Sequence, residues 1–442
     1  MPEKTVSPEP KVSTTTRPEN QKGIWFHIRD YLHHLSLFSK EARLFLLGTF
    51  FVAYTFAVYQ LLLNLYLKEL GFKEGFIGSL LSATALGTLA ISIPLVYLMH
   101  RVSYRTILVA SVLSSAASYA LLSLLLHQTG LWLAAFFSGA SAAGLRLVAP
   151  PFFMRSSGPK ERTYLFSLNF GTWILAAIVG SLTGGYLVKL LSSGGQSQLS
   201  SLRWALLSSI ALGLVGVIPF GKIKTKPAEK QIPSEVWKWS NLKKRGRLYF
   251  KLAFPLFLVG TGAGLIIPFL NLYFKTLFNQ SAHQIGLYFA WLQLFMLAGI
   301  LTGPVLAKKL GMVRSIVYTE VASIPFMLIL AFTSSLGLAV GAFFIRGALM
   351  NMAQPITTHF AMEAVEEKEH PLVNSLIALA WTLSWVFSAG LGGKLIELYS
   401  FAPPLVIAAG LYVLSSGLYY YYFGKAEKKF FKSEPITLPE TG

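Results

Sequence analysis

Long apolar stretches separated by short polar segments dominate this chain. A helix of about 20 mostly apolar residues is long enough to cross the hydrocarbon core of a bilayer. Twelve stretches meet that length: 43–66, 75–99, 106–127, 131–154, 164–188, 202–221, 250–274, 284–307, 314–335, 338–361, 372–396 and 402–423. The pattern therefore predicts an all-α membrane protein with twelve transmembrane helices.

The polar segments divide the predicted spans into two groups of six. Residues 1–22 are rich in Pro, Thr and charged residues, which predicts a disordered tail. Residues 23–42 carry apolar side chains at helical spacing and predict an amphipathic helix on the membrane surface. The predicted division is completed by a six-helix bundle at 43–221, a basic cytoplasmic linker at 222–249, a second bundle at 250–423 and a tail at 424–442.

Composition and charge agree with a membrane location. Hydrophobic residues make up 54% of the chain and charged residues only 13%, about half the share found in soluble domains. The net charge of +19 would indicate nucleic-acid binding in a soluble protein. Here 29 of the 38 Lys and Arg residues fall in segments on the side of both termini, and 6 fall in segments on the other side. This asymmetry predicts an integral plasma (inner) membrane protein with both termini in the cytoplasm, and no nucleic-acid partner.

The two predicted bundles are related by an internal repeat. Residues 161–190 align with 369–398 without a gap at an offset of 208, with nine identities. The clearest of these are Glu161/Glu369, Trp173/Trp381, Gly184/Gly392 and Gly185/Gly393. A second pair of similar segments, NLYLKEL at 64–70 and NLYFKTL at 271–277, has an offset of 207. Two parallel repeats of six spans resemble the architecture of the major facilitator superfamily of transporters.

The family's signature loop between spans two and three is only partly present. The equivalent segment, VYLMHRVSYR at 96–105, has the basic residues, but His100 stands where the family has an aspartate. In the second half, PVLAKKLG at 304–311 has Lys308 where an acid is expected. The resemblance implies that these loops control closure of the cytoplasmic side through His100, Arg101, Arg105, Lys308, Lys309 and Gly311. Because the acids are replaced, we expect closure to use the acidic cluster Glu363, Glu366, Glu367 and Glu369 or helix C-termini.

Two arginines lie inside predicted spans, where an ionisable side chain is costly and marks a functional candidate. Arg146 falls in the fourth span and Arg346 in the tenth, and the resemblance implies that both spans line a central cavity. Because a guanidinium group binds carboxylates and phosphates well, two cavity arginines would favour an anionic substrate. Two structural alternatives stay open: Arg146 extending to the membrane surface, and Arg346 pairing with Glu320 of the ninth span.

Polar and aromatic side chains on the predicted cavity spans complete the candidate site, although each could instead serve packing between helices. The substrate-binding candidates are Arg146, Arg346, Gln60, Asn351, Gln354, Trp173 and Trp381. The candidates for carrying a coupling proton are Glu320, His359 and Glu363.

The sequence contains no nucleotide-binding loop, no zinc motif and no carboxylate cluster typical of a membrane enzyme. We therefore expect a secondary active transporter that works by alternating access on an anionic or amphipathic small molecule, with a proton as coupling ion. A lipid or amphiphile flippase or a drug exporter of the same fold is one alternative, and a transport-inactive scaffold or sensor is another. We expect no enzymatic activity, no cofactor and no metal, and a monomer whose partners are its substrate and the lipid bilayer.

Overall fold

The computed structural model describes residues 38–224 and 239–430. The predicted tail at 1–22, residues 23–37 of the predicted amphipathic helix and the centre of the linker lie outside these ranges, whereas residues 40–42 form the start of the first span. Within them, twelve spans are long and apolar enough to cross a membrane. They coincide with the twelve stretches predicted from the hydropathy pattern, and their ends differ by a few residues in most cases.

The N-terminal half contains six spans, most of which begin at a polar cap. Ser39, Ser103 and Ser197 each accept a hydrogen bond from a backbone N–H of the first helical turn, which satisfies a donor that would otherwise have no partner. The helices are α2 (Lys40–Glu69), α3 (Glu74–Met99), α4 (Tyr104–Leu124), α5 (Gln128–Ser156), α6 (Pro159–Ser193), α7 (Gln198–Leu214) and α8 (Val217–Gly221), the last two forming one span.

The C-terminal half repeats this arrangement, with an interruption in its first span. That span consists of α9 (Trp239–Ile266), the 3-10 turn η2 (Ile267–Phe269) and α10 (Leu270–Phe278). The interruption coincides with Pro268, which cannot donate a helical hydrogen bond. The remaining elements are α11 (Ala282–Leu310), α12 (Met312–Phe332), α13 (Leu336–Glu363), η3 (Glu367–Glu369), α14 (His370–Leu398) and α15 (Ala402–Phe430). Helix α9 begins inside the stretch predicted as linker.

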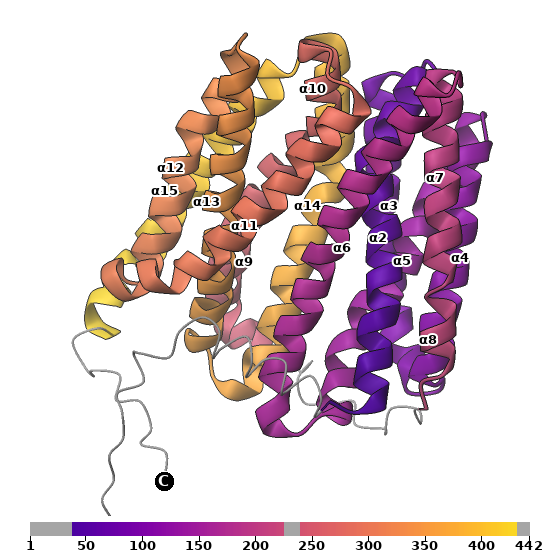
Figure 1. Ribbon diagram of the computed structural model, residues 1–442. Coiled ribbons are helices and arrows are strands. Elements are labelled where there is room, and N and C mark those ends of the chain that lie inside the picture. Colours follow the sequence, from indigo (N-terminus) through magenta and orange to yellow (C-terminus); the bar gives the residue numbers. More distant parts are fainter. Residues whose placement is uncertain (1–37, 225–238, 431–442) are drawn as a thin grey trace, which may run out of the picture.

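The two halves lie side by side and meet through α3 with α14 and α6 with α11 (Figure 1). We call the end with the first residue of α2 and the last residue of α8 the terminal end, and the opposite end, with the α2–α3 and α10–α11 turns, the far end. The terminal end is at the bottom of Figure 1 and α10 is at the top. Among the described residues, the hydrogen bonds and ion pairs that join the halves lie toward the far end.

Glycines bring the helix backbones together at this junction. A Cβ atom on Gly78 of α3 would lie 2.5 Å from the carbonyl oxygen of Ala389 on α14. A Cβ on Gly185 of α6 would lie 2.7 Å from the carbonyl oxygen of Ala282 on α11. Only glycine permits such close contact between helices, so both crossings depend on its missing side chain. The repeated glycines of the sequence therefore serve, at least in part, to pack one half against the other.

Candidate functional site

Arg146 lies on α5 with its side chain exposed, although this stretch of α5 is inside a membrane span. Its guanidinium carbon is 5.9 Å from the centre of the Phe56 ring on α2. The Phe56 ring in turn meets Trp173 of α6 edge to face, with 6.0 Å between the ring centres. We call these three residues the Arg146 cluster. It joins one cation, which can also stack on an aromatic face, to two aromatic side chains from neighbouring helices.

The repeat places a different residue at the corresponding position of the other half. Gln354 of α13 corresponds to Arg146 at the offset of 208, and its side chain is also exposed. Further polar side chains follow on α13: Asn351 is half-buried, whereas His359 and Glu363 are exposed, with Nε2 of His359 3.2 Å from Oε1 of Glu363. Polar side chains inside a span avoid lipid and face water or protein. The four side chains do not share one face of α13, because Gln354 and Glu363, nine residues apart, point to opposite sides of the helix.

Two other predicted residues have distinct surroundings. Trp381 on α14 is exposed, and its ring packs against α9 at Gly260 and lies 6.4 Å from the ring of Trp385. Gln60 on α2 has an exposed side chain, while its backbone carbonyl accepts a hydrogen bond from Asn271 of α10. Gln60 therefore belongs both to the set of exposed polar side chains and to the junction of the halves.

Arg346 differs from Arg146 in being buried, with 4% of its surface exposed. Its Nη2 donates to the hydroxyl of Tyr412 on α15 at 3.0 Å. Glu320 on α12 is 5% exposed, and its Oε2 accepts from the hydroxyl of Ser416 on α15 at 2.7 Å. No ion pair within 4.0 Å joins Arg346 to Glu320 in the described residues. Each residue instead has its own hydroxyl partner on α15, Tyr412 for Arg346 and Ser416 for Glu320, and sequence reasoning identified neither partner.

The predicted gating residues are not brought together across the halves. Arg101 packs on Tyr97 of its own half and donates to its hydroxyl at 2.6 Å. Arg105, Lys308 and Lys309 are exposed, and His100 is half-buried. Gly311 has φ of 89° and ends α11, a conformation that favours glycine over other residues. The backbone conformation at the end of α11 therefore accounts for a glycine at position 311.

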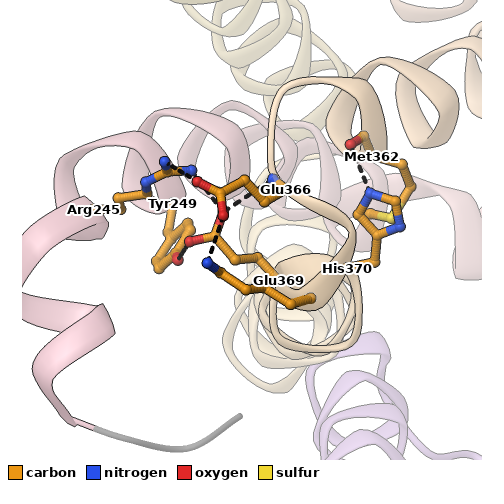
Figure 2. Close-up of polar contacts among 7 residues, drawn as sticks. Arg245, Tyr249, Met362, Glu366, Glu369 and His370 are labelled. Carbon is orange, nitrogen blue, oxygen red and sulfur yellow. Dashed lines mark hydrogen bonds and ion pairs between the residues drawn. The ribbon is translucent and has the colours of Figure 1, made fainter. Parts of the chain in front are cut away.

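The acidic residues after α13 form a polar network at the terminal end (Figure 2). Arg245 of α9 donates from Nη1 to Oε2 of Glu369 at 2.7 Å and also pairs with Glu366. The hydroxyl of Tyr249 donates to Oε1 of Glu369 at 2.7 Å, and the backbone N–H of Glu366 donates to Oε2 of Glu369 at 3.0 Å. A hydrogen bond from Lys368, together with the charge of Arg245, holds the pKa of Glu366 below its usual value.

This network fixes the start of α9 against the start of α14 within the C-terminal half. The sequence-based expectation was that the acidic cluster would close the cytoplasmic side. In this conformation Glu366 and Glu369 bind Arg245, and Glu363 binds His359. The counterpart of Glu369 in the first repeat, Glu161, also accepts from the backbone N–H three residues earlier, that of Gly158, whereas the bonds to Arg245 and Tyr249 are recorded for Glu369. The repeat is therefore not symmetric in this respect.

Replacing Glu369 by glutamine should lower the melting temperature of the purified protein. Glu369 is 6% exposed and accepts from three donors, and hydrogen bonds to a charged group each contribute about 1.5–3 kcal/mol. The neutral amide keeps one acceptor and adds donors that meet Arg245. The matched control is Glu367→Gln, which changes an exposed neighbour of the same charge. Equal melting temperatures for the two variants in detergent would contradict the structural role of Glu369.

Comparisons with known proteins identify the architecture. A sequence profile of the Major Facilitator Superfamily matches residues 45–364 and 252–437. A point mutant of the nucleoside transporter NupG superimposes with a TM-score of 0.72 at 16% identity, covering 87% of this chain and 100% of that chain. A bacterial homologue of the human lysosomal transporter Spinster, in an inward-facing and unoccupied conformation, gives a TM-score of 0.70 at 15% identity, covering 90% and 98%. No curated protein has a significant match to the sequence.

The structural likenesses show a shared fold, because their sequence identities are too low to carry a shared substrate. The profile match covers most of the chain, and the twelve spans repeat as six and six. The chain therefore belongs to the major facilitator superfamily of membrane transporters.

Proposed function

We propose that this chain is a secondary active transporter of the inner membrane, which moves a small organic anion by alternating access. The distribution of Lys and Arg favours cytoplasmic termini, so the terminal end would face the cytoplasm and the far end the outside. With the halves joined toward the far end, this conformation is then the inward-facing one of the cycle. The cycle requires that this junction opens and that the halves meet at the terminal end.

The observation that carries the proposal is the exposed guanidinium of Arg146 within a membrane span. Its guanidinium lies beside the ring of Phe56 and interacts with Tyr119, and none of the ion pairs of the described residues neutralises it. A guanidinium group attracts carboxylates and phosphates and can bind them through two parallel hydrogen bonds. Phe56 and Trp173 would then contact the apolar part of the substrate.

The remaining predicted contacts divide according to their surroundings. Gln354 and Asn351 on α13, with Gln60 on α2, offer neutral hydrogen-bonding groups to the substrate, and Trp381 offers an apolar face. Arg346 is left out of the proposed site because its guanidinium is buried against Tyr412. The proposed site thus has one cation, on the N-terminal half, and neutral polar groups on the C-terminal half.

We further propose that Glu320 carries the coupling proton. Its carboxyl group is buried within a span and accepts a hydrogen bond from Ser416. Because a buried carboxylate without a counter-charge is costly, such a group readily takes up a proton. The pair His359–Glu363 is exposed at the terminal end of α13, where it could exchange protons with the cytoplasm.

Replacing Arg146 by alanine should weaken anion binding at least tenfold, because a charge-assisted pair is lost. The ligand would first be found by thermal shift against alkyl carboxylates, phosphate monoesters, anionic lipids and cationic amphiphiles. Arg146→Lys should restore binding only in part, since lysine lacks the planar fork. Arg43→Ala, which removes an exposed arginine at the start of α2, is the matched control.

The panel also separates the proposed function from its alternatives. Stabilisation by anionic lipids alone, lost in the Arg146→Ala variant, would identify a lipid or amphiphile flippase. Stabilisation by cationic amphiphiles with no response to Arg146→Ala would favour a drug exporter. Anion affinity that is the same in the Arg146→Ala variant and in the wild type would end the proposal. Uptake of the bound ligand into proteoliposomes distinguishes a transporter from a scaffold or sensor.

A further inference from the structure

Two asparagines at repeat-equivalent positions exchange hydrogen bonds across the junction of the halves. Nδ2 of Asn64 on α2 donates to the carbonyl oxygen of Pro268 at 2.6 Å. Nδ2 of Asn271 on α10 donates to the carbonyl oxygen of Leu61 at 2.8 Å. Asn64 and Asn271 are 207 residues apart, and so are Leu61 and Pro268. The two bonds are therefore related by the internal repeat, like the contacts of a two-fold symmetric dimer.

The two amides also contact each other directly. Nδ2 of Asn64 lies 3.3 Å from Oδ1 of Asn271, and Nδ2 of Asn271 lies 3.3 Å from the carbonyl oxygen of Gln60. Asn64 is 4% exposed and Asn271 is 1% exposed. Buried amides that lose their partners are costly unless water replaces them. Separation of the halves at this point must therefore break these bonds and admit water.

The interruption of the seventh span makes this geometry available. In a continuous helix, the backbone N–H of Leu272 would donate to the carbonyl of Pro268, four residues earlier. Here that N–H donates to Oδ1 of Asn271 at 2.8 Å, and the Pro268 carbonyl accepts from Asn64. On the other side, α2 is a continuous helix, and the Leu61 carbonyl can accept from Asn271 with its second lone pair. The two repeat-related asparagines thus bond to different kinds of backbone: Asn64 bonds to the interrupted seventh span, and Asn271 bonds to the continuous helix α2.

We propose that Asn64 and Asn271 form a clamp that holds the far end shut, and that its strength sets the balance between the conformation described here and the one opened at the far end. This inference rests on the proposed alternating access. The pair acts as positioning residues, because the two amides bond to backbone carbonyls of the opposite half and to each other. Gln60, whose carbonyl belongs to the clamp and whose side chain is exposed, connects the clamp to the proposed substrate site.

The clamp can be tested by distance measurements between spin labels, because the chain has no cysteine of its own. One pair of labels, at Lys189 of α6 and Thr276 of α10, reports on the far end. A second pair, at Arg43 of α2 and Leu310 of α11, reports on the terminal end. In Asn64→Ala and Asn271→Ala, we expect a longer far-end distance and a shorter terminal-end distance. The ratio of the two populations should change about fivefold to tenfold for each variant, since each loses at least one buried hydrogen bond.

The matched control is Gln280→Ala at the same end of the molecule. Gln280 is a buried amide whose partners, Phe278 and Tyr288, belong to its own half. The control should keep the wild-type distances. Asn64→Leu and Asn271→Leu, which have similar shape and no polar atoms, replace the alanine variants if those fail to fold. Wild-type distances in the double variant would overturn the clamp. Because no substrate is needed, a failure of anion binding at Arg146 would leave this test unaffected.

Discussion

Replacing Arg346 by methionine should lower the melting temperature of the purified protein and leave substrate affinity nearly unchanged. Methionine fills much of the same volume but removes the guanidinium that donates to Tyr412. Arg346 and Glu320 both act electrostatically on the Tyr412 hydroxyl, so the variant leaves Glu320 as the only one of these two charges at that hydroxyl. Breaking a buried charge pair by removing one partner costs about 3–5 kcal/mol, and we expect a somewhat smaller loss here because hydroxyls separate the two groups. A fall of roughly 5 °C or more is the corresponding change in melting temperature.

The double variant Arg346→Met with Glu320→Gln provides the decisive control. If the two charges stabilise one another through the α15 hydroxyls, removing both should recover part of the stability lost by the single variant. Melting temperature in detergent and ligand affinity would be measured on the same samples. A variant with wild-type melting temperature and weakened anion binding would instead return Arg346 to the substrate site.

The spans were predictable because hydropathy directly reflects the membrane requirement for about 20 apolar residues. The ends of a span and its interruptions were harder to predict from the sequence. The seventh span begins earlier than predicted, since α9 starts at Trp239, and it breaks near Pro268, which hydropathy alone does not report. The linker at 222–249 was predicted from its polar composition, and its centre lies outside the described residues.

The direction in which a side chain faces was not predictable in the same way. A membrane helix is apolar on all sides, so hydropathy does not distinguish a face toward lipid, protein or water. Arg146 and Arg346 therefore looked equivalent in the sequence, although the first is exposed and the second is buried against α15. Tyr412, which bonds to Arg346, and Ser416, which bonds to Glu320, lie in the twelfth span, where no sequence pattern marks them as partners of these residues.

The internal repeat carried more information than any single motif. The pair of similar segments at 64–70 and 271–277 marks the asparagines that meet across the far end. The same kind of offset relates Arg146 to Gln354, a correspondence between different residues that identity matching cannot detect. Among the shared residues, Asn64 with Asn271 and Gly185 with Gly393 lie at the junction of the halves, whereas the difference between Arg146 and Gln354 makes the two halves chemically unequal. That inequality fits the asymmetric substrate that we propose, a small organic anion.

Adding a methyl group at the α3–α14 crossing should prevent the far end from closing. In Gly78→Ala the new Cβ would lie 2.5 Å from the carbonyl oxygen of Ala389. In Gly393→Ala it would meet the backbone carbonyl of Glu74. Backbone atoms of a long helix cannot move aside individually, so the helices must separate, and overpacking of this kind costs about 1–3 kcal/mol. The double variant should therefore favour the conformation opened at the far end and lose most transport, because its halves cannot return.

Labelling of a cysteine introduced at Ser82 provides the measurement. In the closed junction the Ser82 hydroxyl accepts a hydrogen bond from the backbone N–H of Gly390 at 2.9 Å, so the position is covered by the other half. An impermeant thiol reagent applied from outside should label Ser82→Cys at least about tenfold faster in the Gly78→Ala, Gly393→Ala background. Gly171→Ala on α6 is the control, since no atom lies within 4 Å of its added Cβ. Labelling and transport at the rate of that control would show that the crossing tolerates a side chain, and that closure of the far end does not depend on these glycines.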